Sequence, residues 1–376
     1  MTNRLRILIF VITILSILCL FGSAGCRRYI FVRESIKIVK DDNVISNFSV
    51  ETADSDWDLL MLRLVNRARL DPSGESVRLG SATIETRVPV PPLAYQRLVG
   101  NAATNHNTWM HANLGQIASG KVPDSFAHYE TLDGTSAGSP AIGLPSYTGA
   151  NPGQRLVAAG YPWNSYGENI LVSYSGNPIL INEAKIISNH KGWWNSSGHR
   201  DNMLSVNFSS FGHKVESRSF VPPLGGLNAP VDNIQFSTEV FAKPLNPRTY
   251  IFGVLYVDRD ENGEWTPRGD NGVTLKEVSP LRDMDGDGDA DLRDYAICQR
   301  MMGLKEGLND EFFDVRMNGS GGLVGCDSTM GNGAFSVKIG DGIYDVVFNR
   351  LNVVIRGVSV LGNNVDVGDT PVILGK

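Results

Sequence analysis

The feature that most constrains the fold is a change in residue pattern at Pro244-Leu245-Asn246-Pro247. Before this segment, apolar residues recur at helical spacing, as in Leu59, Leu60 and Leu64. After it, short runs of alternating apolar residues are separated by turn signals such as Asn262-Gly263. Since 376 residues are enough for two domains, we interpret the prolines as a linker between a helix-containing domain and a strand-rich domain.

The pattern predicts the elements of both domains. In the first domain we expect four helices. The first begins at residue 57 and ends at Asp71-Pro72, the second follows Pro91-Pro92 and continues through Met110, and the others cover 154–159 and 182–194. We also expect strands over 210–217 and 233–241. In the second domain we expect strands over 250–257, 334–339, 344–348 and 353–358. The first domain lacks regular βαβ alternation, which indicates an α+β fold with α-β-α layers, and the second is typical of a small β-sandwich.

The N-terminus predicts export. Arg4 and Arg6 precede an apolar run over residues 7–21, which is shorter than the roughly 20 residues of a membrane span. Gly22-Ser23-Ala24-Gly25 and Cys26 follow, a stretch that resembles a bacterial lipobox, in which the cysteine is lipidated. We therefore expect a signal peptide over 1–25, a tether over 26–54 and a membrane anchor at Cys26. Cleavage without lipidation and an uncleaved anchor are the alternatives.

Charge and cysteine content narrow the partners and the compartment. The formal net charge of −6 and the absence of a long basic run argue against a nucleic-acid partner. An exported chain lies in an oxidising compartment, where a disulfide between Cys298 and Cys326 is plausible. Hydrophobic residues make up 42% of the chain, enough for a sizeable core.

Several motifs of the first domain occur in a fixed order. Phe126-Ala127-His128 comes first, Gly167-Glu168-Asn169-Ile170 follows, and the last is the segment from Trp193 to Leu204 with His199 at its centre. Shorter matches accompany them, namely L-x-x-V-N-R-A-R near Asn66, P-L-A-Y near Leu93 and R-L-x-A-A-G-Y ending at Tyr161.

In these motifs the chain resembles the CAP superfamily (cysteine-rich secretory, antigen 5 and pathogenesis-related proteins, also called SCP domains), over roughly residues 57–241. The resemblance implies a shallow cleft in which His128, Glu168 and His199 face one another. The family's second glutamate would fall at Ser196, so two histidines and one glutamate remain. As large aromatic residues, Trp193 and Trp194 are expected to lie in the core on one side, with one ring lining the cleft.

The chemistry of this set has two interpretations. Two imidazoles and a carboxylate can hold Zn²⁺ with an open position, so His128 and His199 are candidate zinc ligands. Alternatively, Glu168 only orients the histidines by hydrogen bonds. No side chain can be placed beside the histidines as a nucleophile, so a nucleophilic triad is not supported. We expect His106 and His111 at the surface or at the edge of the core.

The second domain contains an acidic segment with calcium-loop spacing, an insertion over residues 281–303. It resembles an EF-hand or dockerin-type repeat, with Gly288 at the sharp turn and Asp294 at the last ligand position. Only one such loop is evident, which speaks against a cellulosome role. So many carboxylates would repel one another without a cation, so we predict Ca²⁺ binding, with a solvated acidic loop as the alternative. The candidate ligands are Asp283, Asp285, Asp287, Asp289, Asp291 and Asp294.

Three functions remain open at this point. The first is an exported, envelope-associated binding module, anchored at the membrane, that takes a lipid, a peptide or another envelope ligand. The second is a metal-dependent hydrolase acting on peptide or cell-wall material through His128, Glu168 and His199. The third is a structural spacer or adhesin. The missing fourth member of the cluster favours binding over catalysis.

Overall fold

The computed structural model describes residues 53, 55–116, 125–219, 233–257, 265, 312–330, 333–348 and 353–372. The predicted signal peptide with Cys26, most of the tether, and the predicted calcium loop with Cys298 all lie outside these residues. Among the described residues, no helix combines the length and apolar character needed to cross a membrane.

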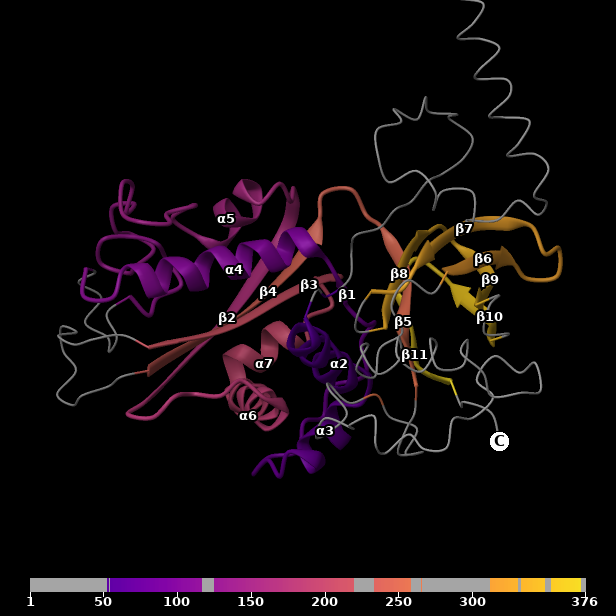
Figure 1. The fold of residues 1–376 in the computed structure, drawn as a ribbon, viewed down its shortest axis with the longest axis horizontal. Coiled ribbons are helices and arrows are strands. Elements are labelled where there is room, and N and C mark those ends of the chain that lie inside the picture. Colours follow the sequence, from indigo (N-terminus) through magenta and orange to yellow (C-terminus); the bar gives the residue numbers. More distant parts are fainter. Residues whose placement is uncertain are drawn as a thin grey trace, which may run out of the picture.

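The first part of the chain places helices on both faces of one sheet (Figure 1). The helices are α2 (Asp56–Leu70), α3 (Pro72–Arg78), α4 (Arg97–Ala112), α5 (Pro152–Ala158), α6 (Glu183–Trp194) and α7 (Ser197–Met203). The strands are β1 (Ala94–Tyr95), β2 (Trp163–Ser175), β3 (Ser210–Ser219) and β4 (Asn233–Pro244), in the order β1-β3-β4-β2. The expected mixture of helices and strands is confirmed, although β2 was not expected as a strand.

Helix ends follow from local hydrogen bonding. Ser55 caps α2 by accepting a hydrogen bond from the backbone N–H of Asp58 at 3.1 Å. Asn182 caps α6 in the same way, accepting from the N–H of Lys185 at 2.9 Å. Acidic residues in the first turn of α2 and arginines in its last turn match the helix dipole. These local signals explain why the helices could be expected from the sequence.

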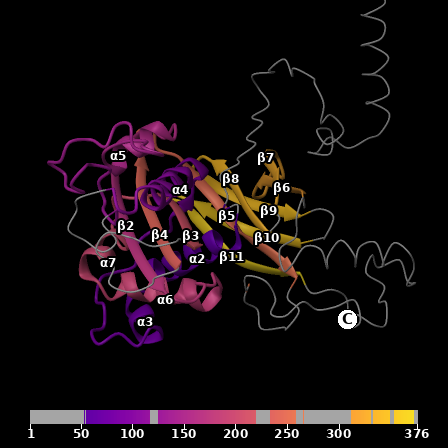
Figure 2. The ribbon, with the colours of Figure 1, turned by 60° about the vertical axis from the view of Figure 1, so that its left-hand side comes forward.

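The helices divide between the two faces of the sheet. Helices α4 and α5 cover one face, and α2, α6 and α7 cover the other (Figures 1 and 2). Side chains of β4 alternate between these layers, since Val240 packs with Val99 of α4, whereas Phe241 belongs to the cluster that includes Trp193 of α6.

The second part of the chain contains two sheets. One consists of β6 (Phe312–Met317), β7 (Leu323–Ser328), β9 (Gly342–Phe348) and β10 (Val353–Val360), in the order β10-β9-β6-β7. The other consists of β5 (Thr249–Val257), β8 (Ala334–Ile339) and β11 (Val365–Val372), in the order β11-β5-β8. Side chains from both sheets share one core, formed among others by Phe313, Phe335 and Phe348.

Strand β5 connects the cores of the two parts. Ile251 and Leu255 belong to the core between the two C-terminal sheets, whereas Tyr250, Phe252 and Val254 join the core formed by α2, α6 and the first sheet. Both faces of β5 are therefore buried, which accounts for its nearly continuous apolar sequence. The two parts on either side of Pro244–Pro247 share one apolar core rather than meeting at a polar surface.

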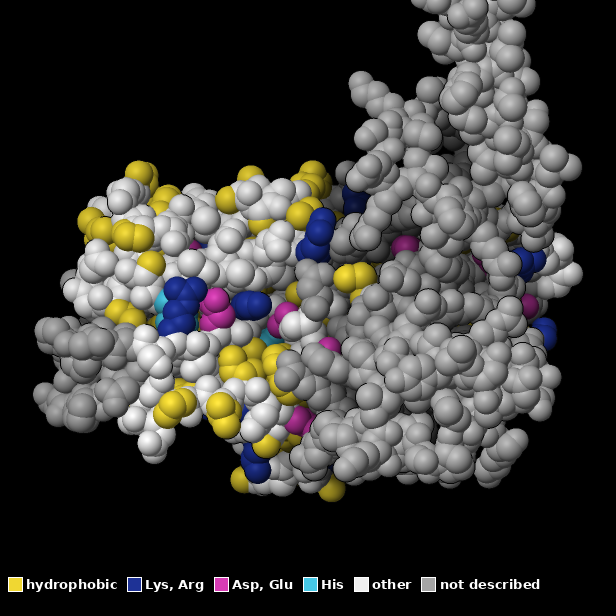
Figure 3. Space-filling model, in the orientation of Figure 1, with side chains coloured by type: hydrophobic (Ala, Val, Ile, Leu, Met, Phe, Trp, Pro, Cys, Tyr) yellow, Lys and Arg dark blue, Asp and Glu magenta, His cyan; other side chains and the backbone are white. Residues whose placement is uncertain are grey.

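The outer edge of the first sheet is charged. Strand β3 pairs with β1 only at Ser210 and Phe211, and beyond these residues it carries Lys214, Glu216 and Arg218 at alternate positions. Basic and acidic side chains alternate in a row on the face of the molecule seen in Figure 3. Charged side chains on an open strand edge oppose pairing with another chain.

Candidate functional site

The Gly-Glu-Asn segment lies on β2, the edge strand of the first sheet. A Cβ atom on Gly167 would lie 2.8 Å from Asn202 Oδ1 and 2.9 Å from Phe208 Cζ, so only glycine allows β2 to approach these side chains closely. Glu168 and Asn169 then point to opposite faces of the sheet. The motif thus positions one polar side chain in each layer.

Glu168 lies in a buried cluster on the α4–α5 face. Its Oε2 accepts a hydrogen bond from Arg155 Nη2 at 2.6 Å, and its Oε1 accepts one from His128 Nδ1 at 3.0 Å. His106 Nε2 lies 3.9 Å from the same Oε1 atom. Arg155 also donates from Nη1 to the carbonyl of His128 at 3.1 Å, which fixes the loop that carries this histidine.

The charge of this cluster is compensated internally. Burial would raise the pKa of Glu168, but the positive charge of Arg155, followed by His106 and the hydrogen bond from His128, lowers this pKa to about 2. Glu168 is therefore a carboxylate at neutral pH. An ionised acceptor requires a proton on Nδ1 of His128, which leaves Nε2 as the ring nitrogen that Glu168 does not engage.

A second buried carboxylate, that of Glu130, contacts the same cluster through His106 and Arg155. Glu130 Oε1 bonds to His106 Nδ1 at 3.1 Å, and Glu130 Oε2 accepts from the backbone N–H of Thr148 at 3.0 Å. Arg155 Nε lies 3.7 Å from Glu130, so one guanidinium serves two buried carboxylates. The expected peripheral position of His106 is wrong, because its ring is fully buried between these groups.

His199 approaches from the other layer. It lies in the first turn of α7, whose N-cap residue is Ser196, where the resemblance would place a glutamate. The Nδ1 atom of His199 is buried and has no hydrogen-bond partner among the described residues. Burial lowers the pKa of His199, and the charge of His128 lowers it further, so His199 is neutral at neutral pH. The two histidines thus influence each other across the edge strand β2.

Asn169 connects this site to the interior on the α6 face. Its Nδ2 donates to the carbonyl of His199 at 3.1 Å and to Glu239 Oε2 at 2.9 Å, and its Oδ1 accepts from Asn202 Nδ2 at 2.9 Å. Glu239 is fully buried, and burial raises its pKa to about 8, an increase that the hydrogen bond from Asn169 only partly offsets. Glu239 is thus mainly protonated at neutral pH.

The donor set does not match a three-ligand zinc site. Both oxygens of Glu168 are already engaged by Arg155 and His128, which leaves two imidazoles as possible ligands. Within the described part of the chain, no group of three or more histidine, cysteine, aspartate and glutamate side chains is placed to hold a metal ion. Catalytic zinc sites use three protein ligands and one open position.

The remaining candidates have structural surroundings. His213 bonds to Asp58 Oδ1 at 2.9 Å and to Ser237 Oγ at 3.0 Å. His111 is buried, and burial and the charge of Arg218 lower its pKa to about 4.

Both rings of Trp193-Trp194 are buried, so the expectation that one ring lines a cleft is wrong. Cys326 is disulfide-bonded, and its partner lies outside the described residues.

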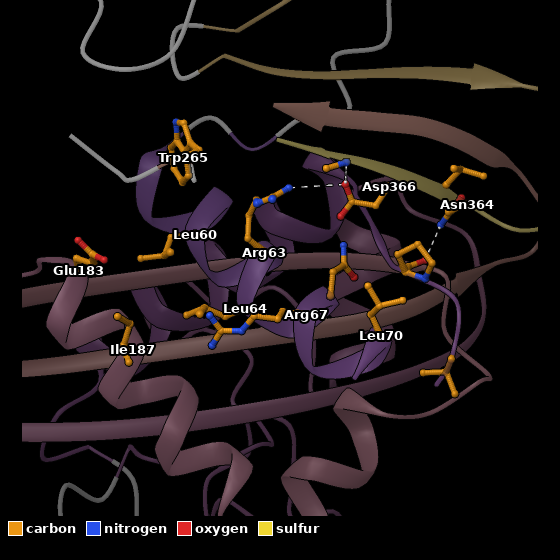
Figure 4. Close-up of a pocket in the computed structure, with 15 residues that line it drawn as sticks. Leu60, Arg63, Leu64, Arg67, Leu70, Glu183, Ile187, Trp265, Asn364 and Asp366 are labelled. Atoms are coloured by element: carbon orange, nitrogen blue, oxygen red, sulfur yellow. Dashed lines mark hydrogen bonds and ion pairs between the residues drawn. The ribbon is translucent and has the colours of Figure 1, made fainter. Parts of the chain in front are cut away.

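A separate pocket of about 520 Å³ lies where the two parts of the chain meet (Figure 4). Leu60 and Leu64 of α2 contribute apolar surface, and β11 and the residues before it contribute Asn364 and Asp366. Arg63 Nη1 lies 3.7 Å from Asp366 Oδ1, and Asn364 Nδ2 donates to the carbonyl of Pro92 at 3.3 Å. Polar side chains that line this pocket, such as Arg63, Asn364 and Asp366, are therefore already engaged in contacts between the two parts of the chain.

Sequence reasoning missed the residues that support the site. Arg155 is the first residue of the R-L-x-A-A-G-Y motif. Its place in this motif is the one feature of the sequence that could have identified it as a residue of the site. Glu130 and Glu239 belong to no motif that we recognised, because a buried carboxylate on a loop or strand looks like a surface residue in the sequence. The motif of α2 is structural, since Asn66 bonds to both backbone groups of Leu93 and Arg69 donates to the carbonyl of Met203.

Comparisons with known proteins give little further guidance. No family model matches the chain, and no curated protein matches it. A solved structure that it resembles is the 1.5 Å crystal structure of an extracellular protein containing an SCP domain from Bacillus anthracis str. Ames, with 18% sequence identity and a TM-score of 0.26. The match covers 49% of this chain and 41% of the other, so this chain spans less than half of that protein. A TM-score this low supports no conclusion about fold or function.

Proposed function

We propose that this chain is an exported, envelope-associated protein of the CAP superfamily that binds a ligand at His128 and His199 rather than catalysing a reaction. The observation that carries the proposal is the buried ion pair between Arg155 Nη2 and Glu168 Oε2 at 2.6 Å. A general base works best when its pKa is near the operating pH, and the pKa of Glu168 is about 2. Glu168 therefore orients His128 instead of accepting a proton.

The two histidines supply hydrogen-bonding groups for a ligand. The side chain of His128 is 38% exposed, and its Nε2 is the ring atom that Glu168 does not engage. His199 is partly exposed and neutral. Imidazole nitrogens donate and accept hydrogen bonds, so the two rings suit the polar groups that lipid headgroups, peptides and other envelope components all carry.

Co-sedimentation tests binding directly. We expect the exported chain to co-sediment with purified peptidoglycan sacculi or with phosphatidylglycerol–phosphatidylethanolamine vesicles. His128→Ala and His199→Ala should each reduce the bound fraction at least fivefold, while the melting temperature changes by less than a few degrees. Tyr174→Ala, an exposed change at the far end of β2, is the matched control. Equal binding by all variants would contradict the proposal.

A metal-dependent hydrolase is the second candidate. It is favoured by the carboxylate–histidine pair, because a histidine that is hydrogen-bonded to a carboxylate through one nitrogen is a better metal ligand through the other. Titration with Zn²⁺ should give no heat above that of a His128→Ala, His199→Ala double variant. One equivalent of tightly bound zinc, together with peptide or cell-wall hydrolysis, would favour the hydrolase.

The anchor and calcium proposals rest on the sequence. We propose lipidation at Cys26, so labelling with a radioactive fatty acid should disappear in Cys26→Ala. We also propose Ca²⁺ binding by the acidic segment from Asp283 to Asp294, so a chelator should lower the melting temperature of the chain. Unchanged melting and no heat on Ca²⁺ titration would support a spacer without a calcium site.

A further inference from the structure

A second concave site lies beside α5, the helix that also carries Arg155 of the Glu168 cluster. It is an open groove of about 410 Å³, a volume within the range of small-ligand sites. Its walls are Asn151, Gly153, Gln154 and Val157 around α5, and Trp163 and Tyr166 from the start of β2. In the view of Figure 3, hydrophobic side chains are exposed at the upper rim, where α4 and α5 lie.

The aromatic side of this site is held rigidly. Trp163 Nε1 donates to the carbonyl of Gly153 at 2.7 Å, and the rings of Trp163 and Tyr166 meet edge to face with centroids 4.6 Å apart. A Cβ atom on Gly153 would lie 2.6 Å from both rings, so glycine is needed for this packing. Both rings are partly exposed: one side of the pair packs against the core cluster that includes Leu156 and Val240, and the pair also lines the groove.

The polar side of the site consists of two amides. Asn151 Oδ1 accepts from the backbone N–H of Gln154 at 2.9 Å, and Gln154 Oε1 accepts from the N–H of Ala150 at 2.7 Å. Both amide oxygens are thus used locally, and this fixes the orientation of each side chain. The two NH₂ groups remain as the available side-chain donors of these residues.

The site carries no charge. None of its lining residues is ionisable at neutral pH, and Arg155, the one basic residue of α5, extends to Glu168 instead. A charged ligand would therefore lose its hydration without gaining a counter-charge, so the ligand is neutral. Aromatic faces attract polarised C–H groups, while the amide donors need hydroxyl or carbonyl acceptors. Sugar rings present both kinds of group on one small molecule.

We propose that the groove between α5 and the start of β2 binds a neutral saccharide, with Trp163 and Tyr166 as the platform and Asn151 and Gln154 as donors. The proposal stands on residues other than His128 and His199, so it does not depend on the function proposed for that pair. Tyr166 lies two residues before Glu168 on β2, and α5 carries Arg155, so the groove and the Glu168 cluster are built on the same two elements.

Chitotriose and maltotriose, two neutral oligosaccharides, test the proposal. We expect one of them to bind the exported chain in calorimetry or in a tryptophan fluorescence titration, with a Kd that changes less than twofold between low and high salt. Tyr166→Ala should weaken binding at least tenfold and Gln154→Ala at least threefold. The change at the exposed Gln154 keeps the test valid if Tyr166→Ala folds poorly. Tyr174→Ala, an exposed change outside both sites, should bind as the unmodified chain does.

The outcomes separate the two sites. Loss of saccharide binding in Tyr166→Ala with sedimentation onto sacculi retained would support two independent sites. Loss of binding in His199→Ala but not in Tyr166→Ala would place the saccharide at the histidines and overturn the proposal. No binding of either oligosaccharide at millimolar concentration would overturn it as well, as would affinity that collapses at high salt.

Discussion

Arg155 decides the chemistry around Glu168 because it provides the compensating positive charge in a buried cluster. Its side chain is almost fully buried and reaches both Glu168 and Glu130. Buried ions are tolerated only when they are paired, and a carboxylate that loses its partner must either be protonated or disrupt its surroundings. The single guanidinium thus holds the loop of His128 and lowers the pKa of Glu168.

Arg155→Met is therefore expected to destabilise the fold by about 3–5 kcal/mol, the cost of breaking a buried pair. Arg218→Met is the matched control, because Arg218 is exposed and pairs with Glu216 at 3.2 Å on the surface, where a pair contributes about 1 kcal/mol or less. Urea unfolding at pH 7 measures both free energies. Similar losses of unfolding free energy in the two variants would show that the buried pair stabilises the fold no more than the surface pair does.

Glu168 also predicts a response to acid. Its pKa is about 2 in the folded chain and 4.5 in its ordinary state, so the ionised group stabilises the fold above pH 4.5. That contribution is lost as the pH falls from 4.5 toward 2. Glu168→Gln should flatten this part of the stability curve in urea unfolding between pH 2 and 5. A variant with the wild-type slope would contradict the assigned ion pair.

Glu239 predicts the opposite trend at higher pH. Burial raises its pKa from 4.5 to about 8, so the folded chain retains a proton that the unfolded chain has released. Its contribution to stability is present below pH 4.5 and falls as the pH rises through 8. Glu239→Gln should remove this loss, so the variant gains stability relative to the unmodified chain between pH 5 and 9. The check is urea unfolding across this range, with Glu216→Gln retaining the original slope.

At the scale of elements, α4 and β3 pack with almost no space between their backbones. A Cβ atom on Gly212 would lie 2.2 Å from the backbone nitrogen of Gly100 and 2.3 Å from the carbonyl carbon of Val99. The backbone of a helix cannot move aside as a flexible side chain can. Glycine at this position therefore sets the distance between the helix layer and the sheet.

Gly212→Ala should destabilise the fold by about 1–3 kcal/mol, the usual cost of overpacking a core. Gly198→Ala in α7 is the contrasting change, because nothing lies within 4 Å of its Cβ position. There alanine should be neutral or stabilise by up to about 1 kcal/mol through helix propensity. Thermal unfolding followed by circular dichroism would compare the two, and equal effects would contradict the close contact.

At the scale of the whole molecule, Asn364 connects the two parts. Its Nδ2 donates to the carbonyl of Ser209 at 2.7 Å, and its Oδ1 accepts from the backbone N–H of Tyr250 at 3.1 Å. One side chain therefore joins the residue before β11, the start of β5 and the segment before β3. Together with the shared apolar core on β5, this contact makes the two parts mutually dependent.

Asn364→Ala should destabilise the chain by about 1–3 kcal/mol, because it leaves buried backbone groups without partners. Unfolding of the described parts should remain a single transition when followed by tryptophan fluorescence and by far-ultraviolet circular dichroism. Asn363→Ala, at an exposed neighbouring position, should have little effect. Two separate transitions in the unmodified chain would show that the parts fold independently.

Local patterns in the sequence determined most of the elements and part of the site. Apolar spacing together with proline and glycine boundaries predicted α2, α4, α5 and α6, and short apolar runs between turn signals predicted β3, β4, β5 and the C-terminal strands β8, β9 and β10. Ordered motifs identified His128 and Glu168, whose side chains lie 3.0 Å apart. Strand β2 was not expected, because it is an edge strand with mixed polar and apolar residues and lacks clear alternation.

Only the tertiary structure decided what charge and burial each group has. Glu130, Glu239 and His106 look like ordinary polar residues in the sequence, and packing from distant segments buries them. Ionisation depends on the distance to Arg155 and on the exclusion of water, and neither is a property of local sequence. The same holds for β5, whose second buried face exists only because α2 and α6 pack against it. The break at Pro244–Pro247 marks a change of residue pattern, and long-range contacts determine that one apolar core crosses it.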